Sequence, residues 1–199
     1  MSHPLFGLVL VGGQSRRMGR DKALLRFDGQ RTQLERTTSL LQRICQRVFI
    51  SQRKEQSFAV PAGTEVIYDA ADPVKGPLCG ILSAGKAYPE ADWLVLACDL
   101  PNVQEATLRK LIEHFDSDKS ALTAYRSSSD GLAEPLCAIY PAGITQQLED
   151  LANQLGKHSP RDLLSASGAT LVEQDAPDSL NNVNTRDEFE AVTKQQDAN

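Results

Sequence analysis

Glycines and cations near the N-terminus are the residues of this 199-residue chain whose types and spacing best suit a chemical role. An apolar run, residues 7–11, leads into Gly12-Gly13 and then into a stretch containing Arg17 and Lys22. Glycines let the backbone approach an anion closely and point several N–H groups at it, and cationic side chains neutralise the remaining charge. We therefore expect a polyphosphate here, although Arg17 and Lys22 taken alone could be ordinary solvated charges.

A carboxylate follows a second apolar run. Residues 93–97 are all apolar, and Asp99 comes just after them, followed by Leu100-Pro101. Mg²⁺ favours one or two carboxylates together with phosphate oxygens, so Asp99 is a candidate magnesium ligand. The alternative role, capping of the next helix, is assigned instead to Asn102, which precedes Glu105 by three residues and forms a capping-box pattern with it.

The distribution of charge limits the kind of partner. Residues 14–26 contain five basic residues and one acid, a local charge of +4, in a chain whose net charge is −5. A small basic island in an acidic protein favours a local anionic ligand and argues against nucleic acid, which requires a broader basic surface. The sequence has no apolar stretch of the roughly 20 residues that span a bilayer and no signal-peptide pattern, so we expect a cytoplasmic protein without membrane contact.

The thiols and imidazoles show no catalytic pattern. The four cysteines include no Cys-x-x-Cys pair and are expected to be buried free thiols, and no motif surrounds the three histidines. The four are Cys45, Cys79, Cys98 and Cys137.

Strand-like and helix-like segments alternate along the chain, which predicts a three-layer α/β/α fold with a mostly parallel, Rossmann-like sheet. The predicted strands span residues 6–11, 48–51, 66–68, 93–97, 121–125, 136–140 and 169–173. The predicted helices span 33–46 and 78–87 and begin at 102, 144, 160 and 185, the fourth ending at Gly156. Residues 127–131 are predicted to be a mobile loop. Because ligands of such sheets bind beyond the carboxyl ends of the strands, the glycine loop is well placed for a phosphate.

The two commonest nucleotide motifs are absent from this loop. The spacing from Gly13 to Gly19 is one residue too long for a P-loop, and there is no Gly-x-Gly-x-x-Gly. The pattern that does match is a nucleotidyltransferase loop, and residues 10–13 with residues 17–23 resemble the bacterial molybdenum cofactor guanylyltransferases. Four further segments resemble that family in the same order: residues 66–69, 76–80, 97–101 and 182–185.

The resemblance implies an enzyme of the nucleotide-diphospho-sugar transferase fold type, which transfers GMP from GTP to molybdenum-molybdopterin and releases pyrophosphate. It implies one domain over residues 1–199, with a nucleotide-binding half over about 1–100 and an acceptor-binding half over about 101–199. The alternatives are a molybdopterin cytidylyltransferase, a nucleotidyltransferase for another small-molecule phosphate, and a non-catalytic nucleotide-binding relative.

The resemblance also implies roles for individual residues. Catalysis falls to Lys22, Asp99 and Arg17, with Asp99 holding Mg²⁺, and the acceptor is bound by Asn182 and Asn184, which could instead be turn residues. The implied nucleotide-binding residues are Leu10, Val11, Gly12, Gly13, Ser15, Lys22, Ser51, Asp69, Gly76, Pro77, Leu78 and Asp99.

The chain departs from the family pattern at three positions. Val11 stands in place of a usual alanine, and Arg186 in place of a common proline. Ser51 stands where an asparagine often contacts the guanine, and a hydroxyl cannot reproduce the paired donor and acceptor of an amide. Asp69 could equally be a polar residue that ends a strand.

The implied protein partners are other cofactor-biosynthesis proteins and the target molybdoenzymes or their chaperones.

Overall fold

Seven strands form one sheet in the computed structural model, which describes residues 3–11, 22–26, 30–56, 59–70, 76–117 and 121–183. The strand order is β3-β2-β1-β4-β6-β5-β7. The strands are β1 (Leu5–Leu10), β2 (Arg47–Gln52), β3 (Glu65–Tyr68), β4 (Asp92–Ala97), β5 (Thr123–Arg126), β6 (Ala133–Tyr140) and β7 (Thr170–Val172).

The sheet is mostly parallel, as predicted. β3, β2, β1 and β4 run in the same direction, β5 and β7 are parallel to each other, and β6 is antiparallel to both of its neighbours. The start of β6 therefore lies at the same edge of the sheet as the carboxyl ends of the other strands. This edge is where a ligand of an open α/β sheet binds.

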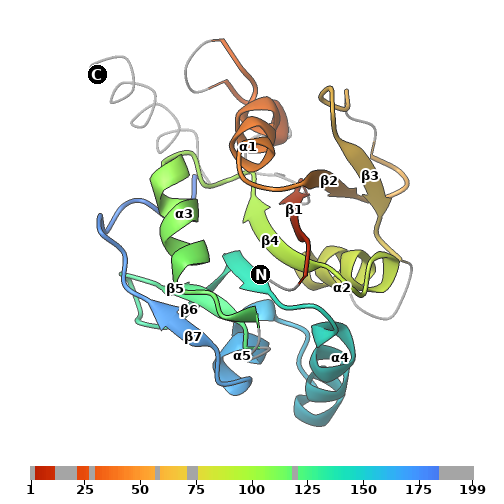
Figure 1. The fold of residues 1–199 in the computed structure, drawn as a ribbon, viewed down its shortest axis with the longest axis vertical. Coiled ribbons are helices and arrows are strands. Elements are labelled where there is room, and N and C mark those ends of the chain that lie inside the picture. The colour runs from red at the N-terminus through yellow and green to blue at the C-terminus, as the bar shows by residue number, and fades with distance from the viewer. Residues whose placement is uncertain are drawn as a thin grey trace.

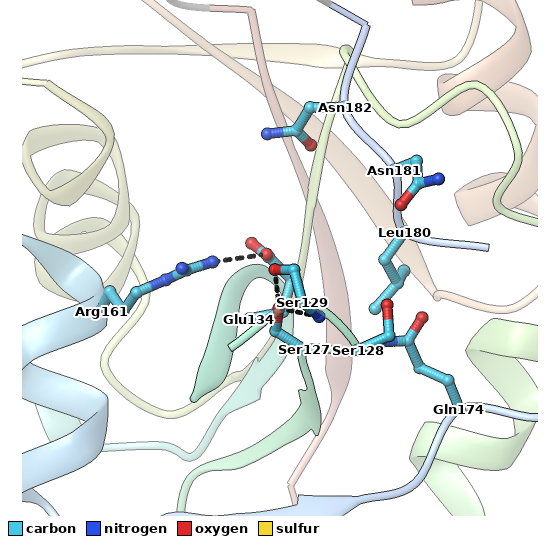
Figure 2. Close-up of a pocket in the computed structure, with 9 residues that line it drawn as sticks. All are labelled: Ser127, Ser128, Ser129, Glu134, Arg161, Gln174, Leu180, Asn181 and Asn182. Carbon is cyan, nitrogen blue, oxygen red and sulfur yellow. Dashed lines mark hydrogen bonds and ion pairs between the residues drawn. The ribbon is translucent and has the colours of Figure 1, made fainter. Parts of the chain in front are cut away.

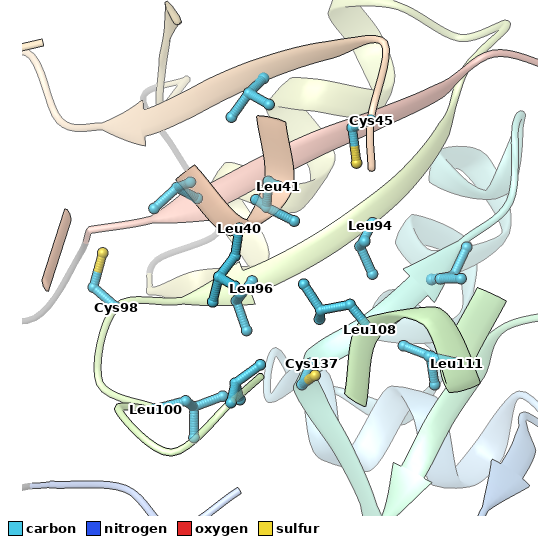
Figure 3. Close-up of a cluster of buried hydrophobic side chains, with 14 of the residues drawn as sticks. Leu40, Leu41, Cys45, Leu94, Leu96, Cys98, Leu100, Leu108, Leu111 and Cys137 are labelled. Atoms are coloured by element: carbon cyan, nitrogen blue, oxygen red, sulfur yellow. The ribbon is translucent and has the colours of Figure 1, made fainter. Parts of the chain in front are cut away.

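Helices cover both faces of the sheet (Figure 1). They are the 3₁₀ helix η1 (Lys22–Leu24) and the α-helices α1 (Gln33–Gln42), α2 (Pro77–Ala87), α3 (Glu105–Glu113), α4 (Ile144–Leu155) and α5 (Pro160–Ala166). One buried cluster joins the sheet to α1 and α3, and the other joins it to α2, α4 and α5. Within β4, Leu94 and Leu96 belong to the first cluster (Figure 3), whereas Trp93 and Val95 belong to the second. This alternation follows from the two-residue period of a strand, and it produces the predicted three layers.

Two helix boundaries differ from the predicted ones. α1 begins with the capping box of Thr32 and Glu35. It ends at Gln42 rather than at residue 46. The Gln46 N–H donates to the Leu5 carbonyl, so the chain has already joined the sheet at that point. α3 begins at Glu105 rather than at Asn102. Pairing and turns outside the helix override the local helical pattern in both places.

Two expectations about composition can be checked in the described residues. All four cysteines are buried free thiols, as predicted. Within the described part of the chain, no helix is both long and apolar enough to span a bilayer. The helix predicted from residue 185 lies outside the described residues.

Candidate active site

The ends of β1 and β4 bring Val11, the last described residue before the glycine loop, close to Asp99. The Leu10 carbonyl accepts the Cys98 N–H at 3.2 Å, so the segment after β4 stays paired with the end of β1. Val11 and Asp99 follow directly on the two sides. The side chains of Leu10, Val11 and Leu78 are buried in the core, so these three residues can meet a ligand only through their backbone groups.

Ser51 and Asp69 contact each other at the ends of β2 and β3. The Ser51 hydroxyl donates to Asp69 Oδ1 at 2.5 Å, and the Asp69 N–H is donated to the Gln52 carbonyl at 2.9 Å. Ser51 is only 4% exposed, whereas Asp69 is half-buried. The hydroxyl of Ser51 is therefore directed at Asp69, and its main effect is to fix that carboxylate at the edge of the sheet.

The first turn of α2 packs tightly against this pair. Gly76 precedes the helix at a φ of 78°, a conformation that favours glycine, and Pro77 occupies the first turn, where its missing N–H costs nothing. Gly80 has no room for a side chain, since a Cβ there would collide with the Ser51 hydroxyl. The Ser83 hydroxyl accepts the Ala70 N–H at 2.9 Å, which ties the segment after Asp69 to the same helix.

Asp99 is linked to the C-terminal segment through the backbone. Its carbonyl accepts the Val183 N–H at 3.0 Å, which brings the exposed Asn182 beside the end of β4. Asn102 does not cap α3, because the N-cap is Gln104 and the Asn102 amide donates to the Asp178 carbonyl. Asp99 lies five residues before that N-cap, so the capping role is excluded for both residues.

Asp99 offers a carboxylate of the kind that Mg²⁺ prefers. It is half-buried, and its Oδ1 is shielded from solvent. A hard cation bound by one or two carboxylates completes its shell with phosphate oxygens and water, and Asp99 fits that donor set. In the part of the chain that the structure describes, no three His, Cys, Asp or Glu side chains converge into a protein-only metal cage.

A polar pocket lies on the other side of Asp99. It has a volume of about 200 Å³ and is lined by Ser127–Ser129, Glu134, Arg161, Gln174 and Leu180–Asn182 (Figure 2). Arg161 reaches from α5 toward Glu134, and its Nη2 donates to Glu134 Oε2 at 3.0 Å. Sequence reasoning missed this pocket apart from Asn182. Residues 127–131, predicted to be a mobile loop, form a turn in which the Ser127 N–H donates to the Leu132 carbonyl, and their mobility stays a prediction.

Several predicted residues are not placed by these contacts. Lys22 opens η1, and the roles predicted for its side chain stay predictions. Five others lie outside the described residues: Gly12, Gly13, Ser15, Arg17 and Asn184.

An open α/β sheet binds its ligands beyond the carboxyl ends of its strands, and in this protein polar side chains gather at that edge. Residues 7–173 match the family model described as the MobA-like NTP transferase domain, and the chain therefore belongs to that family and is a nucleotidyltransferase.

The relatives agree with this family. The chain is 36% identical over 187 residues to a molybdenum cofactor biosynthesis bifunctional protein of Synechocystis, covering 94% of this chain but 53% of that protein. It therefore spans about half the length of that relative. It is 31% identical to a probable molybdenum cofactor guanylyltransferase of Bacillus cereus, covering 94% of this chain and 95% of the relative.

The same fold occurs in a solved structure, the molybdopterin-guanine dinucleotide biosynthesis protein A of Archaeoglobus fulgidus. The TM-score is 0.75 at 21% identity, with 98% of this chain and all of the other chain covered. At this identity the likeness establishes the fold, and it agrees with the expected α/β architecture.

Proposed function

We propose that this nucleotidyltransferase transfers GMP from GTP to molybdenum-molybdopterin, forming the guanine dinucleotide and pyrophosphate. The observation that carries the proposal is the position of Asp99 between two polar groups. The Ser51–Asp69 pair lies at the ends of β2 and β3, and the pocket of Glu134 and Arg161 lies beyond β4 on the other side. A transferase must hold two substrates on either side of one reacting atom, and this arrangement provides that separation.

The nucleotide is assigned to the β1–β3 side. Backbone N–H groups from Leu10, Val11, Gly12, Gly13 and Ser15 would surround its phosphates, and Lys22 and Arg17 would neutralise them. Asp69, held by Ser51, would accept hydrogen bonds from the ribose or the base. The first turn of α2, residues 76–78, would close the base side of the site through its backbone.

The acceptor is assigned to the β4–β6 side, with Asn182 and Asn184 near its phosphate. That phosphate attacks the α-phosphorus of the nucleotide, the bond to the β-phosphate breaks, and pyrophosphate leaves with the electron pair. A phosphate monoester is already ionised near neutral pH, so no general base is required. Asp99 would hold Mg²⁺, which when bound screens the two anions from each other. Lys22 stabilises the charge that develops at the α-phosphorus.

Calorimetry with GTP, CTP, ATP and UTP in the presence of Mg²⁺ tests the nucleotide half of the proposal. We expect a clear preference for GTP, with Ser51 tolerated at the base side. A preference for CTP would keep the mechanism but reassign the enzyme to cytidylyl transfer. Failure of all four to bind would overturn the assignment of the loop. Release of pyrophosphate from GTP that depends on added molybdopterin then tests the acceptor half.

A further inference from the structure

Glu134 is a buried carboxylate that lines a pocket outside the predicted nucleotide site. Its side chain is 10% exposed, and it lies near the start of β6, the antiparallel strand beside β4. The pairing of β4 with β6 ends with Leu96 opposite Cys137. Asp99 lies three residues after Leu96, and Glu134 lies three residues before Cys137. Because the two strands are antiparallel, both residues lie toward the same edge of the sheet. Burial is the main cause of the raised pKa of Glu134, and the charge of Asp99 raises it further, which is consistent with this proximity.

A β-bulge fixes the position of Glu134. Ala124 of β5 pairs with Ala138, but its neighbour Tyr125 pairs with Glu134, so the residues of β6 between these two partners have no counterpart in β5. Pro135, which has no N–H to donate to a ladder, lies in this gap. Bulges beside active sites commonly redirect one side chain, and this shift in register lies directly beside Glu134.

The charges of the pocket do not suit an anion. Among its described lining residues, Arg161 is the one cation, and its two ion pairs, with Asp130 at 2.6 Å and with Glu134 at 3.0 Å, already neutralise it. The acceptor's phosphate therefore has no free cation here and belongs on the Asp99 side. The pocket instead presents carboxylate and serine hydroxyl oxygens (Figure 2).

Both oxygens of Glu134 can still accept. Oε1 accepts a hydrogen bond from the Leu136 N–H at 3.3 Å, and Oε2 accepts one from Arg161 Nη2. Each oxygen keeps a further lone pair for a ligand. These bonds fix the plane of the carboxylate. The volume of about 200 Å³ is below the roughly 300–1,000 Å³ of pockets that enclose a drug-sized ligand, so it suits a ring system rather than a whole cofactor.

We propose that Glu134 recognises the pterin ring of the acceptor by accepting two parallel hydrogen bonds from its 2-amino group and the adjacent ring N–H. This inference rests on the proposed function, because it takes the acceptor to be a pterin. A neutral ring edge with two adjacent donors matches a fixed carboxylate, and Arg161 is the positioning residue that holds that carboxylate in plane. Glu134 is a specificity residue and takes no part in the bond-making step.

The variant Glu134→Gln tests this inference, because it keeps the size of the side chain but replaces one acceptor with a donor. We expect the KM for molybdopterin to rise roughly 10- to 100-fold, in line with the loss of a charged hydrogen-bonding group. The kcat should change less than threefold, and the Kd for GTP should stay the same. The matched control is Glu65→Gln on β3, which also breaks a Glu–Arg pair but lies outside the pocket, and it should leave the KM unchanged.

A second measurement uses the unmodified protein and therefore does not depend on the folding of a variant. Unsubstituted pterin should compete with molybdopterin at least tenfold better than lumazine, which differs from it only by carrying an oxygen in place of the 2-amino group. Equal competition by the two, or an unchanged KM in a folded Glu134→Gln protein that still turns over, would overturn the role of Glu134 and leave the proposed function intact. Absence of GTP binding or of GMP transfer in the unmodified protein would refute the proposed function itself.

Discussion

The backbone N–H of Val183 donates to the carbonyl of Asp99 at 3.0 Å, and this bond joins two segments that are 84 residues apart in the sequence. It attaches the C-terminal segment to the end of β4, where Asn182 meets the polar pocket. The bond uses the backbone carbonyl of Asp99 and does not involve its carboxylate. Substitution of the Asp99 side chain should therefore test its chemistry without detaching this segment.

The variant Asp99→Asn should lose most of its activity while staying folded. Removal of a group that stabilises charge in the transition state typically costs about 100- to 1,000-fold in kcat, and we expect a loss in that range for pyrophosphate release. Affinity for GTP without metal and the thermal midpoint should change little. The control is Asp150→Asn, an exposed residue on α4. Near-normal turnover by Asp99→Asn would exclude Asp99 as the metal ligand.

The contact between Gly80 and Ser51 predicts a coupling of stability. A methyl group at Gly80 would collide with the Ser51 hydroxyl, which cannot turn away because it is buried and bonded to Asp69. We expect Gly80→Ala to lower the free energy of unfolding by about 1–3 kcal/mol, as overpacking does. Urea denaturation would measure this change.

The double variant Gly80→Ala, Ser51→Ala serves as the control for that prediction. Ser51→Ala alone should cost about 0.5–1.5 kcal/mol through the lost hydrogen bond. The pair should cost less than the two single losses combined, because removal of the hydroxyl relieves part of the collision. Strict additivity would show that the first turn of α2 shifts to accommodate the methyl group.

Burial of Cys45 predicts a loss of stability at alkaline pH. Desolvation raises the pKa of its thiol from 9.0 to about 12, so the unfolded chain releases this proton more readily than the folded one. The contribution of this thiol to the free energy of unfolding is fully present below pH 9. It decreases as the pH rises from about 9 toward 12, by at most about 1.4 kcal/mol per pH unit. Urea unfolding at a series of pH values would measure the slope.

The variant Cys45→Ala isolates this residue, since its slope above pH 9 should be shallower than that of the unmodified protein. Iodoacetamide at pH 8 gives an independent reading. The native protein should resist alkylation at all four cysteines, and the urea-unfolded chain should react at each of them. Rapid labelling of native Cys45 would contradict the burial that underlies the prediction.

The sequence alone was a good guide where structure depends on local pattern. The apolar run of β4 predicted a central strand followed by a carboxylate at the ligand-binding edge of the sheet, and Gly156 ends α4 in the left-handed conformation, as expected. The prediction was wrong where distant contacts decide, as at Asn102, whose amide bonds a carbonyl 76 residues away instead of capping α3.

The polar pocket of Glu134 and Arg161 was the main feature that sequence reasoning did not find. Glu134 lies before Pro135 in a strand, and proline favours a strand end, so the predicted strand began at 136 and left the carboxylate outside it. Its partner Arg161 comes from a helix 27 residues later. A signal did exist, because a charged residue beside a run of apolar strand residues is costly to bury without a partner.

The reversed direction of β6 has a consequence for how this protein can diversify. The residues proposed to contact the nucleotide come from the ends of β1–β4, the loop after β1 and the first turn of α2, whereas the pocket proposed for the acceptor is lined by residues 127–129, 134, 161, 174 and 180–182. Mutations that reshape the pocket therefore leave strands β1–β4 and the loop after β1 unchanged. A lineage could exchange one acceptor for another while keeping the same nucleotide, and the two specificities can be selected independently in the laboratory.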